Sequence, residues 1–325
     1  MALIAGAVSG ERGEPELSVL QNVSSQTRLL VVAPHPDDET IAAGLLIQRV
    51  RAAGGEVRIL LLTPGDNNPW PQRWLERRVR IRAPDRARWG ERRRIELHQA
   101  LARLDLPTHA LHTMDWPDLG VTDLLHAATD AAVSGLTAAV DAFAPNLILI
   151  PALTDSHPDH GAAHVLMRLA LANRVDPPPL FAYLIHGRPS KTAAAQVMPT
   201  SSDNQRTKLA AVEAHQSQMA LSGRRMRHLA SRPELYLDVR SKPLAVTATA
   251  LPWQPPAWLQ PLLRLSVVSR SEVREYRWSQ APLRRDDQGV YHLTKGDAQA
   301  APWFVRLTTT VPSPWIFDHW GWIEL

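Results

Sequence analysis

The apolar positions in the first two thirds of the chain follow two alternating patterns. Short continuous apolar runs predict buried strands of a parallel sheet, and the segments between them place apolar residues at helical spacing. The runs cover residues 29–33, 56–63, 110–114 and 146–152. Amphipathic helices are predicted over residues 86–104, about 124–143 and about 160–172. This period of strand, loop and helix predicts an α/β fold with a Rossmann-like, doubly wound, mostly parallel sheet.

The pattern changes beyond about residue 240. Residues 243–325 hold seven of the chain's eleven tryptophans, and short branched runs predict a small C-terminal β-rich appendage there. We expect the tryptophans to form its core, with a sugar-binding groove or a membrane-docking surface as alternatives. We therefore divide the chain into an N-terminal arm at 1–27, an α/β domain at 28–240 and a Trp-rich appendage at 241–325, with a linker at about 240–256.

The composition is typical of a globular protein. With 325 residues and 45% hydrophobic content, the chain can fill a sizeable core, and no apolar run approaches the roughly 20 residues that span a bilayer. The apolar N-terminus lacks a basic segment before it, so we expect no secretory signal and a soluble, cytoplasmic protein. The absence of cysteine leaves histidine and carboxylate as the strong metal ligands.

The positive charge of the chain is concentrated in one segment. Between Arg73 and Arg94 there are ten arginines against three acidic residues, a local net charge of +7. The first interpretation is a solvated helix face, followed by contact with an anionic substrate or lipid. Nucleic acid comes third, because no RNA platform, zinc finger or helix-turn-helix pattern accompanies the run.

Polar clusters follow two of the predicted strands. His35, Asp37 and Asp38 come after the first strand, and residues 155–160 come after the run at 146–152. Carboxyl ends of parallel strands meet at one sheet edge, which is where ligands bind. His35, Asp38 and His160 would form a two-histidine, one-carboxylate set with open coordination positions, as in a catalytic metal site. The alternatives are helix-capping aspartates and, for His164, a core histidine in place of a ligand.

Four motifs carry a resemblance to a known family. PHPDDE stands at residues 34–39 and HPDH at 157–160, while R..E...A begins at Arg93 and K..A...H.SQ begins at Lys208. Over about residues 28–220 the chain resembles the LmbE-like (PIG-L) zinc-dependent N-deacetylases. Three positions depart from the family pattern and none belongs to the proposed metal set: Asp105, Leu119 and Asn146.

The resemblance implies hydrolysis of an N-acetyl or other N-acyl amide on an amino sugar or glycoconjugate. Zinc is the favoured ion, with Fe²⁺ or another divalent ion as an alternative. The implied metal ligands are His35, Asp38 and His160. The implied catalytic groups are Asp37 as general base, His157 as the group that stabilises the oxyanion when protonated, and Asp159 as the residue that orients His157. The implied sugar-binding residues are Arg93 and Asp118.

The chemistry supports this assignment independently. An amide is a poor electrophile, and a metal ion can both polarise its carbonyl and lower the pKa of water toward ~7. A carboxylate beside a ligand, such as Asp37, can then take the proton.

Several of these residues also have a purely structural interpretation. Asp159 could cap the following helix, Arg93 could be a surface member of the basic run, and Trp116 could be core as readily as a sugar-stacking residue. A buried polar network that ties a helix to the sheet is expected for Lys208, His215 and Gln218.

Other functions stay open at this point. A related amidase acting on a non-sugar conjugate is the nearest alternative. A non-haem iron oxygenase or an inactive sugar-binding protein is less favoured, and a metallo-β-lactamase-like hydrolase lacks a ligand because Asp155 stands two residues before His157. For partners we expect a glycoconjugate substrate, no nucleic acid, no transmembrane segment and at most peripheral membrane contact.

Overall fold

The computed structural model describes residues 18–187, 195–239, 249–294, 302–311 and 317–325. Seven strands form one sheet in the order β3-β2-β1-β4-β5-β7-β6. The first five run parallel, β7 pairs antiparallel with β5, and β6 pairs antiparallel with β7. This confirms the predicted doubly wound, mostly parallel sheet. The strands are β1 (Arg28–Ala33), β2 (Glu56–Leu61), β3 (Leu111–Thr113), β4 (Leu147–Pro151), β5 (Leu180–Tyr183), β6 (Ala195–Val197) and β7 (Leu235–Asp238).

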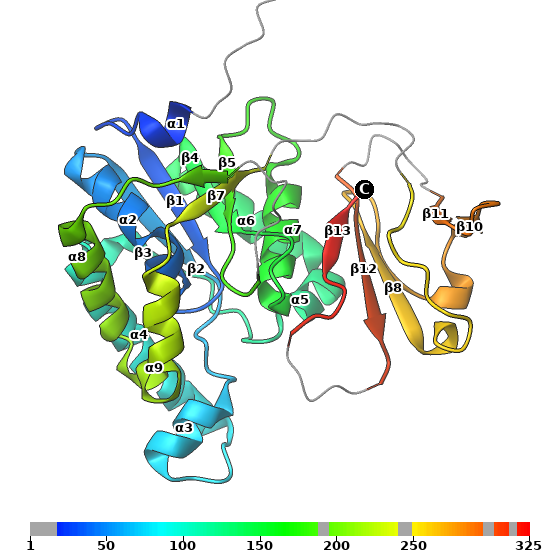
Figure 1. Cartoon of the computed structure of the whole chain (residues 1–325), viewed down its shortest axis with the longest axis horizontal. Coiled ribbons are helices and arrows are strands. Elements are labelled where there is room, and N and C mark those ends of the chain that lie inside the picture. Colours follow the sequence, from blue (N-terminus) through cyan, green and yellow to red (C-terminus); the bar gives the residue numbers. More distant parts are fainter. Residues whose placement is uncertain (1–17, 188–194, 240–248, 295–301, 312–316) are drawn as a thin grey trace, which may run out of the picture.

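Helices cover both faces of this sheet (Figure 1). Alternate residues of β1 enter two separate cores: Leu29 and Val31 pack with α2, α4, α8 and α9, whereas Leu30 and Val32 pack with α5, α6 and α7. Burial on both faces explains why the strands read as continuous apolar runs. The helices are α1 (Ser18–Gln21), α2 (Asp38–Ala52), α3 (Pro69–Glu76), α4 (Ala83–Arg103), α5 (Val121–Ala127), α6 (Thr129–Phe143), α7 (Pro158–Leu171), α8 (Ser202–Glu213) and α9 (Gln216–Ala230).

One predicted helix and one family motif are each divided between two helices. The helix expected at about 124–143 is broken at Ala128, whose φ of −145° separates α5 from α6. The K..A...H.SQ stretch is likewise divided, because His215 (φ −77°, ψ 57°) lies between α8 and α9. Neither break carries a proline or glycine, so neither has a local signal in the sequence.

The C-terminal part forms further antiparallel sheets, as predicted. β8, β9, β12 and β13 make a four-stranded sheet in the order β13-β12-β8-β9, and β10 pairs with β11. The strands are β8 (Leu263–Val268), β9 (Val273–Arg277), β10 (Leu283–Arg285), β11 (Tyr291–Leu293), β12 (Phe304–Thr309) and β13 (Trp322–Glu324); single 3-10 turns are η1 (Thr108–Ala110), η2 (Gln260–Leu262) and η3 (Trp278–Gln280).

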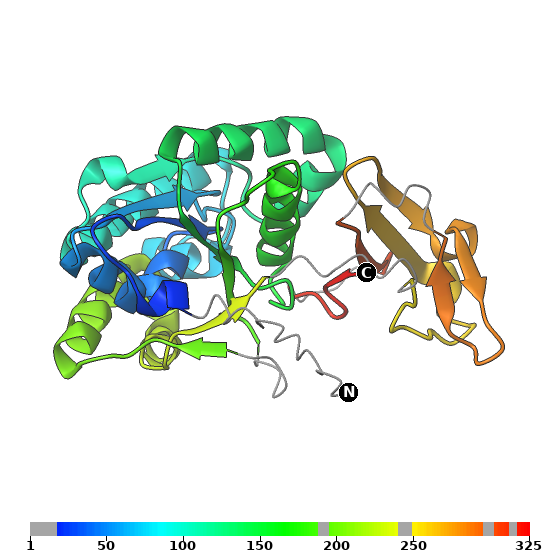
Figure 2. The same ribbon diagram turned by 90° about the horizontal axis from the view of Figure 1, so that it is seen from above.

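β13 joins the appendage to the α/β domain (Figures 1 and 2). Trp322 packs into the α7 core, and a Cβ on Gly161 would lie only 2.6 Å from its ring. Arg168 on α7 donates two hydrogen bonds to Glu324, at 2.7 and 3.1 Å. Apolar packing and a bidentate pair therefore hold the last strand against α7.

The tail tryptophans divide into core and surface. Trp278, Trp303 and Trp322 are buried, which confirms the core interpretation for these three, whereas Trp258 is 75% exposed. Trp315 and residues 240–248 of the linker lie outside the described residues. Among the helices that the structure does describe, none combines the length and apolar character needed to cross a bilayer.

A buried polar network ties α2 to α8 and to the start of β7. The Glu234 carboxylate accepts hydrogen bonds from Lys208 Nζ (2.6 Å), the Tyr236 hydroxyl (2.6 Å) and the backbone N–H groups of Leu45 and Leu46. Gly44 admits the lysine stem, because a Cβ there would lie 2.9 Å from Lys208 Cγ. This confirms the buried-network interpretation of Lys208.

We expect Lys208→Ala to destabilise the fold by about 3–5 kcal/mol, because it leaves the Glu234 carboxylate buried without its cation. Arg206→Ala is the matched control on the same helix, since Arg206 and its partner Asp203 are exposed. It should change the free energy of unfolding by less than about 0.5 kcal/mol. Urea unfolding followed by circular dichroism measures both variants, and equal stabilities would contradict the argument.

Candidate metal centre

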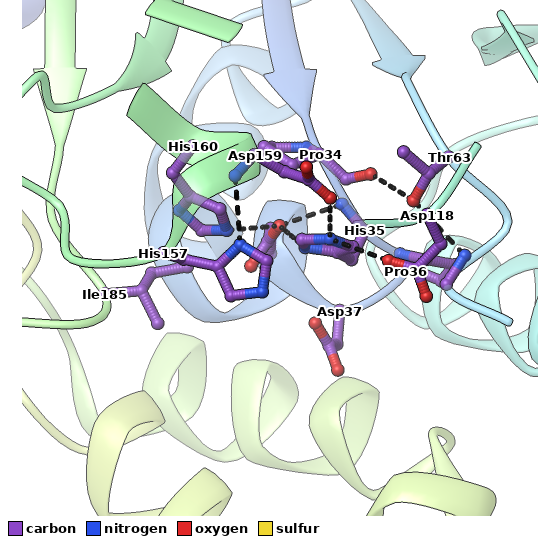
Figure 3. Close-up of polar contacts among 12 residues, drawn as sticks. Pro34, His35, Pro36, Asp37, Thr63, Asp118, His157, Asp159, His160 and Ile185 are labelled. Carbon is purple, nitrogen blue, oxygen red and sulfur yellow. Dashed lines mark hydrogen bonds and ion pairs between the residues drawn. The ribbon is translucent and has the colours of Figure 1, made fainter. Parts of the chain in front are cut away.

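The three predicted metal ligands lie together at the carboxyl ends of β1 and β4. Asp38 Oδ2 is 3.3 Å from His35 Nδ1 and 3.2 Å from His160 Nε2. β1 and β4 are adjacent, and the strand order reverses between them, so their loops face one crevice. Figure 3 shows the His35, His157 and His160 rings turned toward one another. Two blocks about 120 residues apart in sequence thus form one cluster.

The loop between β1 and α2 is held in a strained conformation. Asp37 has a φ of 127°, which a residue with a side chain rarely adopts. Arg93 stabilises it, because its guanidinium donates to the carbonyl oxygens of Pro36 and Gly65, both at 2.6 Å, and lies 3.2 Å from Asp37 Oδ2. This geometry lets Asp38 begin α2, with its carboxylate bonded to the His35 backbone N–H at 2.9 Å. Strain of this kind is concentrated at functional sites.

The cluster offers donor atoms for a divalent metal ion, although among the described residues no group of ligand atoms within 4.8 Å of one another contains His35, Asp38 and His160 together. His160 is fully buried, and neither ring nitrogen has an aligned hydrogen-bond partner among the described residues, although carboxylate oxygens lie 3.2 Å from each. An ion would satisfy such an orphaned nitrogen. The groups whose ligand atoms lie within 4.8 Å of one another are His35 with His157 and His160, Asp38 with His160 and His186, and His35 with Asp118 and Asp159.

Asp155 supports His160 from behind. Its Oδ2 lies 3.2 Å from His160 Nδ1, and its carboxylate also accepts from the backbone N–H groups of His157, Ile185 and His186 at 2.9–3.0 Å. Burial alone would raise the pKa of Asp155, but His160 outweighs it and the pKa falls to about 2. A permanent carboxylate at Nδ1 leaves Nε2 directed at Asp38, the arrangement that orients metal-binding histidines.

The carboxylate of Asp159 does not contact His157, contrary to the predicted orienting role. It accepts from the backbone N–H groups of Leu119 and Val121 at the start of α5, at 2.8 and 3.1 Å, and lies 3.2 Å from His35 Nε2. Only the backbone N–H of Asp159 approaches His157, at 3.3 Å from Nδ1. Asp159 thus joins the start of α5 to His35, and the capped helix is α5, not the α7 helix expected from sequence.

The pKa values of the neighbouring Asp37 and Asp38 are shifted in opposite directions. Burial raises the pKa of Asp37 to about 6, although the Arg93 guanidinium opposes the rise. Burial acts on Asp38 too, but His160 and His35 outweigh it and hold the pKa of Asp38 well below its usual range. Asp38 is therefore a fixed carboxylate, whereas Asp37 is poised to exchange a proton near neutral pH. In Figure 3 the Asp37 side chain lies apart from the histidine cluster.

The predicted substrate residues are buried. Arg93 is 5% exposed, so it is not a surface member of the basic run, and its contacts hold the loop at Asp37. Asp118 lies 3.2 Å from His35 Nε2 and accepts from the backbone N–H of Asn67 at 2.6 Å. Both residues border the site, and both already make polar contacts within the protein.

Two residues of the site were missed in the sequence. The His186 ring lies 5.0 Å from that of His160 and 5.4 Å from that of His157, and Arg225 donates to His186 Nδ1 at 2.8 Å. The Phe317 ring lies 5.5 Å from His186 and 6.1 Å from His157. A strand prediction over the LFAYLI run would have placed His186 at the sheet edge. Phe317 had no signal, because only tertiary packing brings it there.

Two other candidates belong to the core. His164 is buried, with Nδ1 2.8 Å from the Pro151 carbonyl oxygen and its ring against Phe304, so it is a core histidine rather than a ligand. Trp116 packs against the α5–α7 core. His215 lies 3.5 Å from the Thr40 hydroxyl, and Gln218 bonds Ser217, as expected of a buried network.

We expect Asp155→Asn to weaken metal affinity about 10- to 100-fold, because it removes the negative charge behind His160 while leaving the ligands in place. Asp141→Asn, on the exposed face of α6, is the control and should bind metal as the wild type does. Competition with a chromophoric chelator measures the affinity. Unchanged affinity in a folded Asp155→Asn protein would contradict the role given to Asp155.

Comparison with known proteins agrees with this geometry. Residues 30–171 match the family model PIG-L, GlcNAc-PI de-N-acetylase. The 1D-myo-inositol 2-acetamido-2-deoxy-alpha-D-glucopyranoside deacetylase of Mycobacteroides abscessus is 34% identical over 158 residues, covering 44% of this chain and 55% of that protein. The corresponding deacetylase of Mycolicibacterium gilvum is 32% identical, covering 44% and 54%. The chain thus spans about half the length of the curated relatives it matches.

Solved structures show the same fold. The A40926 pseudoaglycone deacetylase Dbv21 superposes with a TM-score of 0.52 at 18% identity, covering 66% of this chain and 97% of that one. The N,N'-diacetylchitobiose deacetylase from Pyrococcus horikoshii gives 0.50 at 17% identity, covering 65% and 81%. The family match ends at residue 171, short of the resemblance predicted to about residue 220. Both sequence blocks and the three predicted metal ligands lie inside residues 30–171, the part of this chain that matches the PIG-L, or LmbE-like, family model.

Proposed function

We propose that this protein is a metal-dependent N-deacetylase that hydrolyses the N-acetyl amide of an amino sugar or glycoconjugate, releasing acetate and a free amine. The observation that carries the proposal is the pair Asp37 and Asp38. The Asp38 carboxylate is fixed between His35 and His160, whereas the Asp37 carboxylate, whose pKa is raised to about 6, can exchange a proton. The names of the curated relatives, which are deacetylases of a GlcNAc-inositol, support the amino-sugar class.

His35, Asp38 and His160 would hold the ion, with zinc favoured and iron(II) as the alternative. When bound, the ion supplies Lewis-acid polarisation of the amide carbonyl and acidifies water. Asp37 then takes the water's proton as general base, since its pKa of about 6 keeps it ionised at neutral pH. Arg93 keeps the Asp37 carboxylate in place through its contact at 3.2 Å.

Two neutral histidines supply hydrogen-bond donors. His157 Nδ1 accepts from the Asp159 backbone, and His186 Nδ1 accepts from Arg225, so each carries its proton on Nε2. Burial lowers the pKa of both, that of His186 to about 4, which favours the neutral form over the protonated His157 expected from sequence. His157 would donate to the oxyanion as the amide carbonyl is attacked, with His186 beside it toward the substrate. Asp159 has a positioning role through His35.

We expect metal-loaded protein to release acetate from N-acetylglucosamine or its conjugates, and chelated protein to release none until a divalent ion is restored. Asp37→Asn should keep the metal but lose about 10²- to 10⁴-fold in kcat, whereas Asp38→Ala should lose metal affinity as well. Acetate release and metal content measure both effects. Equal metal loss in the two variants would show that base and ligand are assigned wrongly, and acetate from sugar-free N-acyl amides alone would favour the related amidase.

The appendage contributes to the wall of the site. The Asp318 backbone N–H donates to the Ser156 carbonyl oxygen at 2.7 Å, and the Asp318 carboxylate pairs with Arg306 of β12. This contact anchors Phe317 over His157 and His186. Among the described residues of the appendage, Phe317 is the aromatic whose ring lies against His157 and His186, whereas Trp253 packs on the appendage core. We assign Phe317 a role in substrate selection. The cytoplasmic location expected from the sequence stays a prediction.

We expect Phe317→Ala to raise KM for a bulky glycoconjugate by roughly five- to tenfold and to leave N-acetylglucosamine nearly unaffected, because only the larger substrate loses the aromatic contact. Trp258→Ala is the matched control, an exposed aromatic of the same appendage. Steady-state kinetics on both substrates, with melting temperatures, test this. An equal loss on both substrates with a lowered melting temperature would point to a purely structural role.

A further inference from the structure

α3 and the turn after it expose a cluster of large apolar side chains. Trp70 and Trp74 are each 66% exposed, Leu75 is 38% exposed and Val79 is 84% exposed. The two tryptophans are four residues apart, so they lie on one side of the helix. We call Trp70, Trp74, Leu75 and Val79 the α3 face. Exposed apolar groups gathered in ten residues mark an interaction surface, unlike single ones scattered over a protein.

The α3 face is presented on a fixed support. Gln72 is buried on the inner side, where its Nε2 donates to the Asp85 carbonyl oxygen at 2.7 Å. Asn68 caps the helix by accepting from the Trp70 backbone N–H at 3.3 Å. Figure 1 shows α3 projecting beyond the ends of α4 and α9. The fold therefore fixes the inner side of α3 and leaves the tryptophans turned outward.

Uncompensated arginines surround the α3 face. Residues 70–82 contain five arginines and one glutamate, a net charge of +4. Arg78 pairs with Asp85 at 2.7 Å, and Arg73 lies over the Trp70 ring at 5.0 Å. The structure records no ion pair for Arg77, Arg80 or Arg82 within the described residues, and all three are exposed. Their positive charge is available to an anionic partner.

We propose that the α3 face docks the protein on an anionic lipid bilayer. Tryptophan rings suit the boundary between headgroups and acyl chains, and arginines beside them pair with lipid phosphates. Leu75 and Val79 distinguish this partner from nucleic acid, because aliphatic side chains offer nothing to phosphates and little to base stacking but insert readily among acyl chains. The face combines apolar insertion with charge attraction, the two contributions that hold peripheral proteins at membranes.

Docking there would bring the candidate metal centre to the membrane surface. Asn67, which precedes the Asn68 cap, donates its backbone N–H to the Asp118 carboxylate at 2.6 Å. The loop that leads into α3 therefore contacts a residue that borders the site. The inference does not depend on the proposed reaction, since bilayer binding is measured without turnover.

Vesicle cosedimentation with the whole protein tests the proposal. Wild-type protein should sediment with vesicles of phosphatidylglycerol and phosphatidylcholine, less so at high salt, and not with phosphatidylcholine alone. Trp70→Ser with Trp74→Ser should weaken binding by at least about tenfold, and Trp70→Phe with Trp74→Phe should restore it, because phenylalanine keeps the apolar area. Trp258→Ser, which removes an exposed tryptophan of the appendage, should bind as the wild type does.

A charge-matched pair of variants tests the arginines. Arg77→Gln with Arg80→Gln and Arg82→Gln should weaken vesicle binding by at least about tenfold. The control removes the same charge from exposed positions of the appendage, Arg270→Gln with Arg277→Gln and Arg284→Gln, and should change binding little. Unchanged binding in the α3 variants, or equal loss in the controls, would overturn the proposal. Tighter binding to RNA or duplex DNA than to vesicles, or a homodimer that vesicles do not dissociate, would assign the face to another partner.

Discussion

The Asp38 carboxylate is the contact on which the rest of the site depends. With one oxygen 3.3 Å from His35 and 3.2 Å from His160, it joins the exits of β1 and β4 where the strand order reverses. A buried carboxylate needs compensation, and it is found in two histidines, a backbone N–H and the start of α2, whose dipole favours negative charge. Bringing Asp38 there requires a positive φ at Asp37, and Arg93 holds that turn through two carbonyl oxygens. The strained residue is thus also the one whose carboxylate stays outside the ligand cluster and free to take a proton.

The support of Asp38 extends along the whole of α2. Glu234 reaches into the middle of this helix and accepts from the Leu45 and Leu46 backbone N–H groups, while Lys208 neutralises its charge. Both ends of the support are buried polar contacts that specify one arrangement, whereas apolar packing alone would permit small shifts of α2. A shift of even ~1 Å in a catalytic group costs much of its effect, so a fixed α2 serves the chemistry as well as stability.

The sequence predicted those parts of the site that are formed by consecutive residues. The blocks at 34–39 and 157–160 fall between a strand and a helix, so their meeting at one sheet edge followed from the topology of parallel sheets. The prediction that Asp159 orients His157 was wrong for a different reason. The Asp159 carboxylate accepts from backbone N–H groups of a loop about 40 residues earlier in the chain, and no rule of residue spacing predicts such a contact. His186 and Phe317 are single residues brought in by β5 and by the packing of β13 on α7. The break at Ala128 has no breaker residue, so periodicity joined two helices into one.

The proposed chemistry and the proposed selection of substrate depend on different parts of the chain. The residues proposed as metal ligands and general base lie within residues 30–171, the part that matches the family model. His186, Arg225 and Phe317, which line the side of the cluster away from His35, lie beyond it. The chain spans about half the length of the curated relatives it matches. A conjugate bound at the candidate site would meet these three residues, which lie outside the part that matches the family model. The proposed amide cleavage thus depends on the matched residues, and the proposed selection of its carrier depends on the segments that hold His186, Arg225 and Phe317.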